Sequence, residues 1–131
     1  MKNIEKILQF AVDAVKTHVL TAEKEVPKEF NGYISAFGAS VIMSGLLPTM
    51  VFFSQEGKSK GARTCVLKSI EQILVKSETL AKDENLLETV LKLYKSPEQL
   101  DQLQNKIQQA GVALKLAIRI FPKSKKDSKH E

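Results

Sequence analysis

Few side chains in this sequence could support covalent or metal chemistry. Its 131 residues include two histidines, His18 and His130, and one cysteine, Cys65. A usual zinc site needs three or four such ligands, so this inventory argues against a zinc centre. Cys65 lies near Lys68, which could favour a thiolate, but no base in the sequence pairs with the thiol. We therefore expect no enzymatic activity and no cofactor.

The remaining candidates for chemistry have ordinary structural interpretations. His18 lies at the edge of an apolar stripe beside Ala14 and Val15, which favours a half-buried structural histidine. A single cysteine cannot form an intramolecular disulfide, so a reducing compartment and a cytoplasmic location are expected.

The charge distribution indicates more about the function than any catalytic motif does. The chain has 20 Lys and Arg against 15 Asp and Glu, a formal net charge of +5. Between residues 30 and 70, Glu56 is the only acid beside four basic residues. Gly57 and Gly61 flank two of these lysines in a loop whose spacing is not that of a P-loop. Such a segment favours an anionic partner such as RNA, although a solvated, solubilising surface would give the same pattern.

We predict that the basic residues of this segment and of the C-terminal region bind RNA. They are Lys58, Lys60, Arg63, Lys68, Lys115 and Arg119. Arg63 either covers neighbouring apolar surface with its stem or reaches a phosphate or carboxylate of a partner. No aromatic residue is interleaved with these positions in the sequence. Contacts of this kind would therefore hold an RNA backbone and ignore base sequence.

The elements that must position these residues are helices, because apolar residues recur at helical spacing nearly throughout the chain. The pattern predicts helices over residues 4–19, 27–44 and 46–55, from residue 62, over 86–91 after a cap at Asp83, and over 97–121. The fold class is therefore all-α, a single-domain bundle of about six helices over residues 1–121. Residues 122–131 are charged and lack an apolar anchor, so they are expected to be a disordered tail.

One uncharged segment, residues 30–55, raises the question of a membrane span. Its apolar part is long enough to cross a bilayer core. Gly45 and Pro48 interrupt it near the middle, which favours two short buried helices joined at Gly45. We expect no membrane association.

The last predicted helix has two apolar faces. One carries Leu114, Ile118 and Phe121, and the opposite face carries Val112, Leu116 and Ile120. The second face must either lie centrally in the bundle or meet another subunit. We assign Val112, Leu116 and Ile120 to a partner interface and leave the central position as the alternative.

Two segments of the sequence resemble a known family. They are residues 32–53, GYISAFGASVIMSGLLPTMVFF, and residues 113–121, ALKLAIRIF. Together they resemble the small helical subunit of the Cmr-type (type III-B) CRISPR effector complex, over about residues 3–121. Ser44 stands where that family usually has asparagine, Pro48 replaces a polar residue, and Ala117 and Ile118 replace the usual tryptophan–leucine pair.

The resemblance implies an all-α, non-catalytic subunit in antiviral defence. Several copies would stack as a filament along the crRNA–target RNA duplex, beside the other Cmr subunits, with no small-molecule substrate. The departures from the family pattern leave individual RNA contacts open. The alternative is a stand-alone helical adaptor that binds only protein and has no nucleic-acid role.

Overall fold

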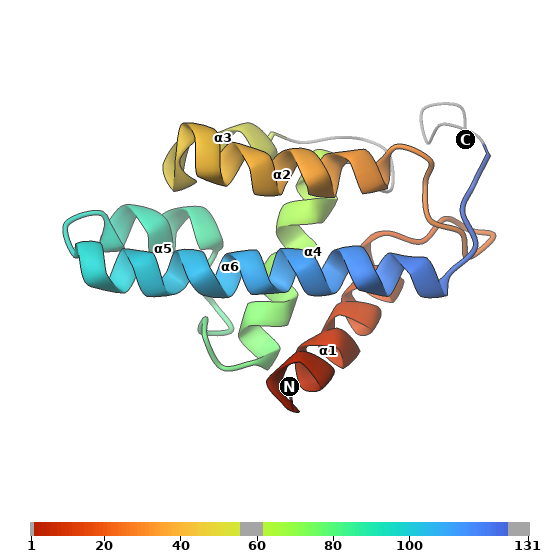
Figure 1. Ribbon diagram of the computed structural model, residues 1–131, viewed down its shortest axis with the longest axis horizontal. Coiled ribbons are helices and arrows are strands. Elements are labelled where there is room, and N and C mark those ends of the chain that lie inside the picture. Colours follow the sequence, from red (N-terminus) through yellow and green to blue (C-terminus); the bar gives the residue numbers. More distant parts are fainter. Residues whose placement is uncertain (1, 56–61, 126–131) are drawn as a thin grey trace.

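Six α-helices make up most of residues 2–55 and 62–125, the part of the chain that the computed structural model describes (Figure 1). They are α1 (Lys2–His18), α2 (Phe30–Ser44), α3 (Leu46–Phe53), α4 (Arg63–Lys76), α5 (Leu86–Leu93) and α6 (Pro97–Ala117), followed by a 3-10 turn, η1 (Ile118–Ile120). No β-strand occurs in these residues. The predicted all-α, single-domain fold is confirmed.

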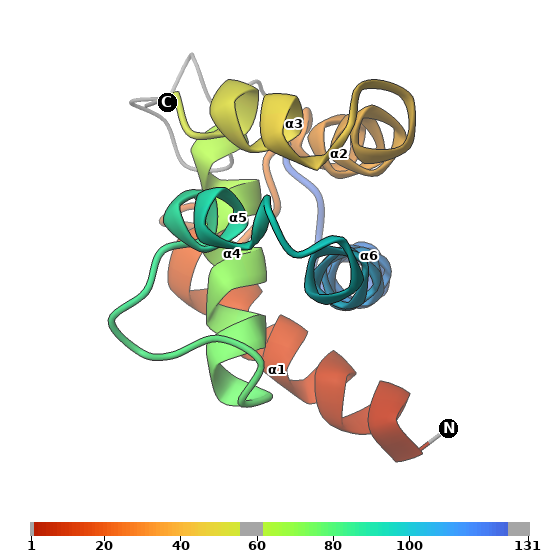
Figure 2. The ribbon, with the colours of Figure 1, turned by 90° about the vertical axis from the view of Figure 1, so that its left-hand side faces the viewer.

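The helices lie along two main directions. α2 and α6 run antiparallel along the long axis of the molecule (Figure 1). Figure 2 shows α3 and α5 on the opposite side from α2 and α6, with α4 crossing between the upper and lower helices. α4 packs against α1, α2, α3 and α6, and α1 covers α4 and α6. α4 is therefore the central element, and its two ends lie at opposite edges of the molecule.

The core is built from the apolar stripes that the sequence pattern predicts. On α2, the buried residues are Phe30, Ile34, Phe37 and Val41, the same four that the helical spacing selects. The rings of Phe37 and Phe53 meet edge to face, with centroids 5.0 Å apart and an interplanar angle of 87°. This geometry is the preferred one for an aromatic pair, and it joins α2 to α3.

The uncharged segment folds back on itself at Gly45. Gly45 has φ 96° and ψ 166°, a conformation that residues with a Cβ rarely adopt. The buried Thr49 hydroxyl donates to the Gly45 carbonyl at 2.8 Å, so the Ser40 hydroxyl, 2.6 Å away, donates to Thr49. The segment is thus two helices, as expected. Among the described helices, none combines the length and the apolar character that crossing a membrane requires.

Two helix starts differ from the predicted positions. α2 begins at Phe30 rather than Pro27, after a turn in which the Phe30 amide donates to the Pro27 carbonyl. The predicted cap of α5 at Asp83 is wrong, because Asn85 accepts from the Glu88 amide at 2.7 Å. A carboxylate oxygen of Glu71 on α4 accepts from the Leu86 amide at 2.7 Å and fixes this helix start against α4.

The C-terminal segment is paired with the loop before α2. The Val26 amide donates to the Pro122 carbonyl, and the Ser124 amide donates to the Val26 carbonyl, both at 2.8 Å. Ser124 is buried. Residues 122–124 of the expected tail are therefore anchored by backbone hydrogen bonds, which the search for apolar residues in the sequence could not reveal. Residues 126–131 lie outside the described residues.

Candidate functional site

The strongest candidate site lies where α3 ends and α4 begins. The Arg63 guanidinium carbon lies 4.4 Å from the centroid of the Phe52 ring. Phe52 keeps 46% of its surface exposed and meets Phe53 edge to face at 5.5 Å. Phe53 is buried, so this contact connects the outer ring to the core. The arrangement is a cation on an exposed aromatic platform.

This platform corrects one conclusion from the sequence. An aromatic ring does accompany the basic positions, because Phe52 lies under Arg63 although the two are eleven positions apart in the sequence. The only feature of the sequence that pointed to an exposed ring here was that α3 is apolar on every side. A surface helix of that kind must leave some apolar side chains outward, and Val51 and Phe52 are the large apolar side chains that it exposes.

The other basic residues of this segment are placed differently. Lys58 and Lys60 lie outside the described residues. Lys68 is exposed on α4 and lines a hollow of about 390 Å³ together with Glu71 and Asn85. Glu71 accepts from the α5 backbone, so an acid as well as a cation lines this hollow. Lys68 thus lies beside an acidic residue, whereas Arg63 lies over the Phe52 ring.

The C-terminal basic residues lie on another side of the molecule. The Lys115 ammonium donates to the Ser35 hydroxyl at 2.7 Å and bridges α6 to α2. Figure 2 shows α2 above α6 on the right of the view, with α3 to the left of α2. Arg119 is exposed in η1, where the α-helical spacing from Lys115 has ended. The structure thus places Lys115 in the α2–α6 groove and Arg63 at the start of α4, over Phe52 of α3, as two separate basic sites.

The second apolar face of α6 is exposed in this chain. Val112 is 56% exposed, Leu116 38% and Ile120 62%, whereas Leu114 and Ile118 are buried. These values exclude the alternative in which the second face fills the centre of the bundle. Val112 also borders a groove of about 220 Å³ between α2 and α6, together with Ser35, Gly38 and Lys115.

The residues considered for catalysis have structural surroundings. His18 is half-buried, and its Nε2 lies 2.9 Å from the Gln72 side-chain oxygen. Cys65 is a free, partly buried thiol. Within residues 2–55 and 62–125, no three His, Cys, Asp or Glu side chains are grouped as metal ligands would be.

Comparison with known families decides the identity of this fold. A family model described as CRISPR-associated protein (Cas_Cmr5) matches residues 3–110. The chain belongs to this family. It is therefore a subunit of a Cmr-type CRISPR complex, and the other Cmr subunits are its partners. No curated protein and no solved structure matches the chain.

Some of the candidate residues lie within the Cas_Cmr5 match and others lie beyond its end. It includes α1 to α5 and the first two thirds of α6, and with them Phe52, Arg63 and Lys68. It ends two residues before Val112, so the exposed face of α6, Lys115 and Arg119 lie beyond it. The likeness noted at residues 113–121 is thus outside the matched range.

Proposed function

We propose that this Cas_Cmr5 subunit acts without catalysis and holds the RNA backbone of the crRNA–target duplex in its complex. The Arg63–Phe52 platform carries the proposal, because it joins an exposed ring to a cation of the basic segment. Lys58 and Lys60 extend that segment in the sequence. A guanidinium supported by a ring can bind phosphate with its outward N–H groups or stack a base on its plane. The setting is antiviral defence in the cytoplasm.

We further propose that Val112, Leu116 and Ile120 bind a neighbouring subunit or another copy in a filament. Exposed apolar residues that follow one another on the end of α6 and on η1 favour a protein partner. Lys115 is held by Ser35 within the same α2–α6 surface, so it fits a role at that interface better than a free RNA contact. Lys68 and Arg119 remain secondary RNA-binding candidates.

A charge-reversal experiment tests the RNA proposal. Lys58, Lys60 and Arg63 are replaced by glutamate, and RNA affinity is measured at several salt concentrations, alone and in the reconstituted complex. Affinity should fall similarly for unrelated RNA sequences, and the dependence on salt should flatten, because phosphate contacts release counterions. The control reverses Lys16, Lys82 and Lys95, which are exposed on other elements and remove the same charge.

A protein-only adaptor is the competing function. The exposed side chains of Ile42, Met43 and Val112 favour it, because they form apolar surface that RNA does not need. If the triple variant keeps the parental affinity and salt dependence in both settings, the RNA proposal fails and the adaptor is supported. Equal losses in the triple variant and its control would also refute a specific role for this segment.

A further inference from the structure

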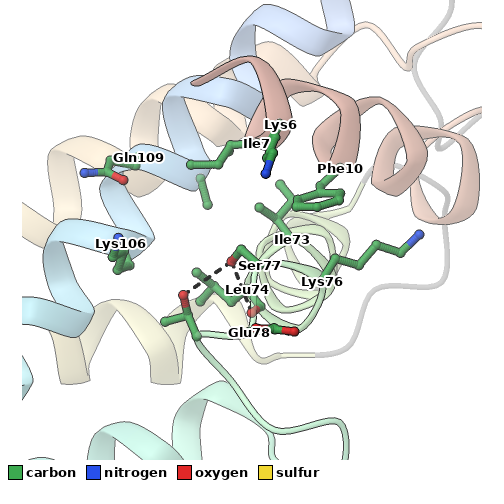
Figure 3. Close-up of a pocket in the computed structure, with 12 residues that line it drawn as sticks. Lys6, Ile7, Phe10, Ile73, Leu74, Lys76, Ser77, Glu78, Lys106 and Gln109 are labelled. Atoms are coloured by element: carbon green, nitrogen blue, oxygen red, sulfur yellow. Dashed lines mark hydrogen bonds between the residues drawn. The ribbon is translucent and has the colours of Figure 1, made fainter. Parts of the chain in front are cut away.

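A cavity of about 400 Å³ lies at the other end of α4 from Arg63 (Figure 3). It opens where α1, the end of α4 and the middle of α6 meet. Volumes of this size accommodate small organic ligands. The cavity shares no residue with the Arg63–Phe52 platform or with the α2–α6 groove, and neither proposed function uses it.

The walls of this cavity carry excess positive charge. Lys6 on α1 and Lys106 on α6 line it, and Figure 3 shows the Lys6 ammonium directed toward the opening. Neither lysine forms an ion pair within the described residues. A third lysine, Lys76, points away in Figure 3 and pairs with Asp13 at 3.6 Å. Two cations from different helices therefore line the cavity, with no ion-pair partner among the described residues.

One part of the cavity wall is apolar and forms its floor. Ile7 and Phe10 from α1 and Ile73 from α4 line this part. A free inorganic anion gains nothing from such a surface, whereas a flat ring buries its faces there. The floor thus favours an anion that also carries a ring.

An acidic residue on the rim, Glu78, further restricts the class of ligand that the cavity can bind. Glu78 follows α4 with φ 63°, a left-handed conformation that glycine usually supplies. The Glu78 amide donates to Val75 and the Thr79 amide donates to Leu74, the two bonds of a Schellman cap. These bonds hold the Glu78 backbone in place at the rim of the cavity, where Glu78 is one of the lining residues. A fatty acid or aromatic acid offers this carboxylate no donor, whereas amino groups of a base and ribose hydroxyls do.

We propose that this cavity binds a nucleotide. The phosphate contacts Lys6 and Lys106, the base lies on the floor formed by Ile7 and Phe10, and a base or ribose donor reaches Glu78. A free nucleoside monophosphate and the terminal nucleotide of an RNA share this chemistry. The bound nucleotide is a ligand that is not turned over, so the proposal is compatible with the absence of catalysis expected from the sequence.

Calorimetric titration of the full chain tests this site. The probes are AMP, GMP, adenosine and inorganic phosphate. We expect a nucleoside monophosphate to bind at least about tenfold more tightly than either adenosine or phosphate, because its nucleoside and its phosphate both contribute to binding. Replacing Lys6 and Lys106 by alanine should weaken monophosphate binding by about tenfold or more. The control replaces Lys16 and Lys95, which are exposed outside the cavity, and should change little.

A carboxamide variant and an RNA competitor complete the test. Glu78→Gln should weaken AMP binding and leave phosphate binding unchanged, because phosphate makes no contact with that group. A short RNA with a terminal phosphate that displaces AMP identifies an RNA end as the ligand, and failure to displace it identifies the free nucleotide. No binding at millimolar AMP, or equal binding by the parent and the two-lysine variant, overturns the proposal. Both outcomes leave the Arg63 experiment unaffected.

Discussion

The Arg63 guanidinium lies 4.4 Å above the ring of Phe52, and this contact joins the first residue of α4 to the end of α3. Cation–ring contacts at exposed sites contribute about 0.5–1 kcal/mol. A double-mutant cycle with Phe52→Leu and Arg63→Gln should therefore give a coupling of about that size in denaturant unfolding. The same cycle with Lys68→Gln in place of Arg63→Gln should give none, because Lys68 lines the hollow beside Glu71 and Asn85 and Arg63 is the residue over the ring. Equal coupling in both cycles would contradict a specific contact.

The structure shows why this contact could not be predicted. The sequence pattern placed Phe30, Ile34, Phe37 and Val41 in the core, because their helical spacing defines a face. α3 is apolar on every side, so spacing alone does not select which of its rings is outward. The cap of α5 was missed for a related reason. Asp83 and Asn85 are both capping residues, and what favours the second is Glu71, distant in sequence, which binds the next amide.

The separation of the basic residues into two sites likewise depends on how the helices pack against one another. Lys115 and Ser35 are 80 residues apart in the sequence, and their bond depends on how α6 packs on α2. Net charge and local density indicated an anionic partner, but they could not show that Lys115 and Arg63 lie on different helix pairs. The helices, their core faces and the turn at Gly45 were predictable because each rests on local residue types and spacing.

Gly45→Ala should destabilise the protein by about 1–3 kcal/mol, because alanine at φ 96° is strained. A Cβ at this position would meet only Pro48, at 3.8 Å, so backbone strain rather than a clash causes the loss. Gly32→Ala is the matched control on α2, where a Cβ meets no atom within 4 Å. That variant should be more stable by about 0.5–1 kcal/mol in urea unfolding. A loss of stability in the control would contradict the helical, open surroundings of Gly32.

Ser69→Ala should raise stability by about 1 kcal/mol. The Ser69 hydroxyl is fully buried in α4 and has no hydrogen-bond partner among the described residues. Removing a buried, unsatisfied polar group returns its desolvation cost. Thr49→Val is the contrasting variant and should lower stability, because the Thr49 hydroxyl bonds to both Gly45 and Ser40. Urea unfolding measures the change in stability of each variant, which should be a gain for Ser69→Ala and a loss for Thr49→Val. If Ser69→Ala destabilises the protein instead, the Ser69 hydroxyl has a hydrogen-bond partner.

Two truncations should separate the C-terminal anchor from the residues beyond it. Deletion of residues 126–131 should leave the melting temperature unchanged. Deletion of residues 122–131 removes both backbone hydrogen bonds to Val26 and should cost about 1–3 kcal/mol, at roughly 0.5–1.5 kcal/mol for each bond. Such a loss lowers the melting temperature of a domain of this size by several degrees. Equal melting temperatures for the two truncations would show that the pairing with Val26 does not stabilise the fold.

Replacing Val112 and Ile120 by serine should impair assembly with little effect on folding. Both side chains are more than half exposed, so the free chain loses little buried area and its stability should change by less than about 1 kcal/mol. In the complex the same substitutions remove apolar area from the proposed interface, and each buried methylene lost there costs about 0.8 kcal/mol. The measurement is co-purification with the other Cmr subunits, alongside thermal unfolding of the isolated variant.

The matched control replaces Ile42 and Met43 at the end of α2, which are 76% and 84% exposed and lie outside the α6 face. If the α6 pair reduces assembly and the α2 pair does not, the interface follows α6 beyond the matched family range. The reverse result would move the partner surface to the end of α2. Normal assembly of both variants would leave Val112 and Ile120 as ordinary exposed side chains, and the proposed interface would be wrong.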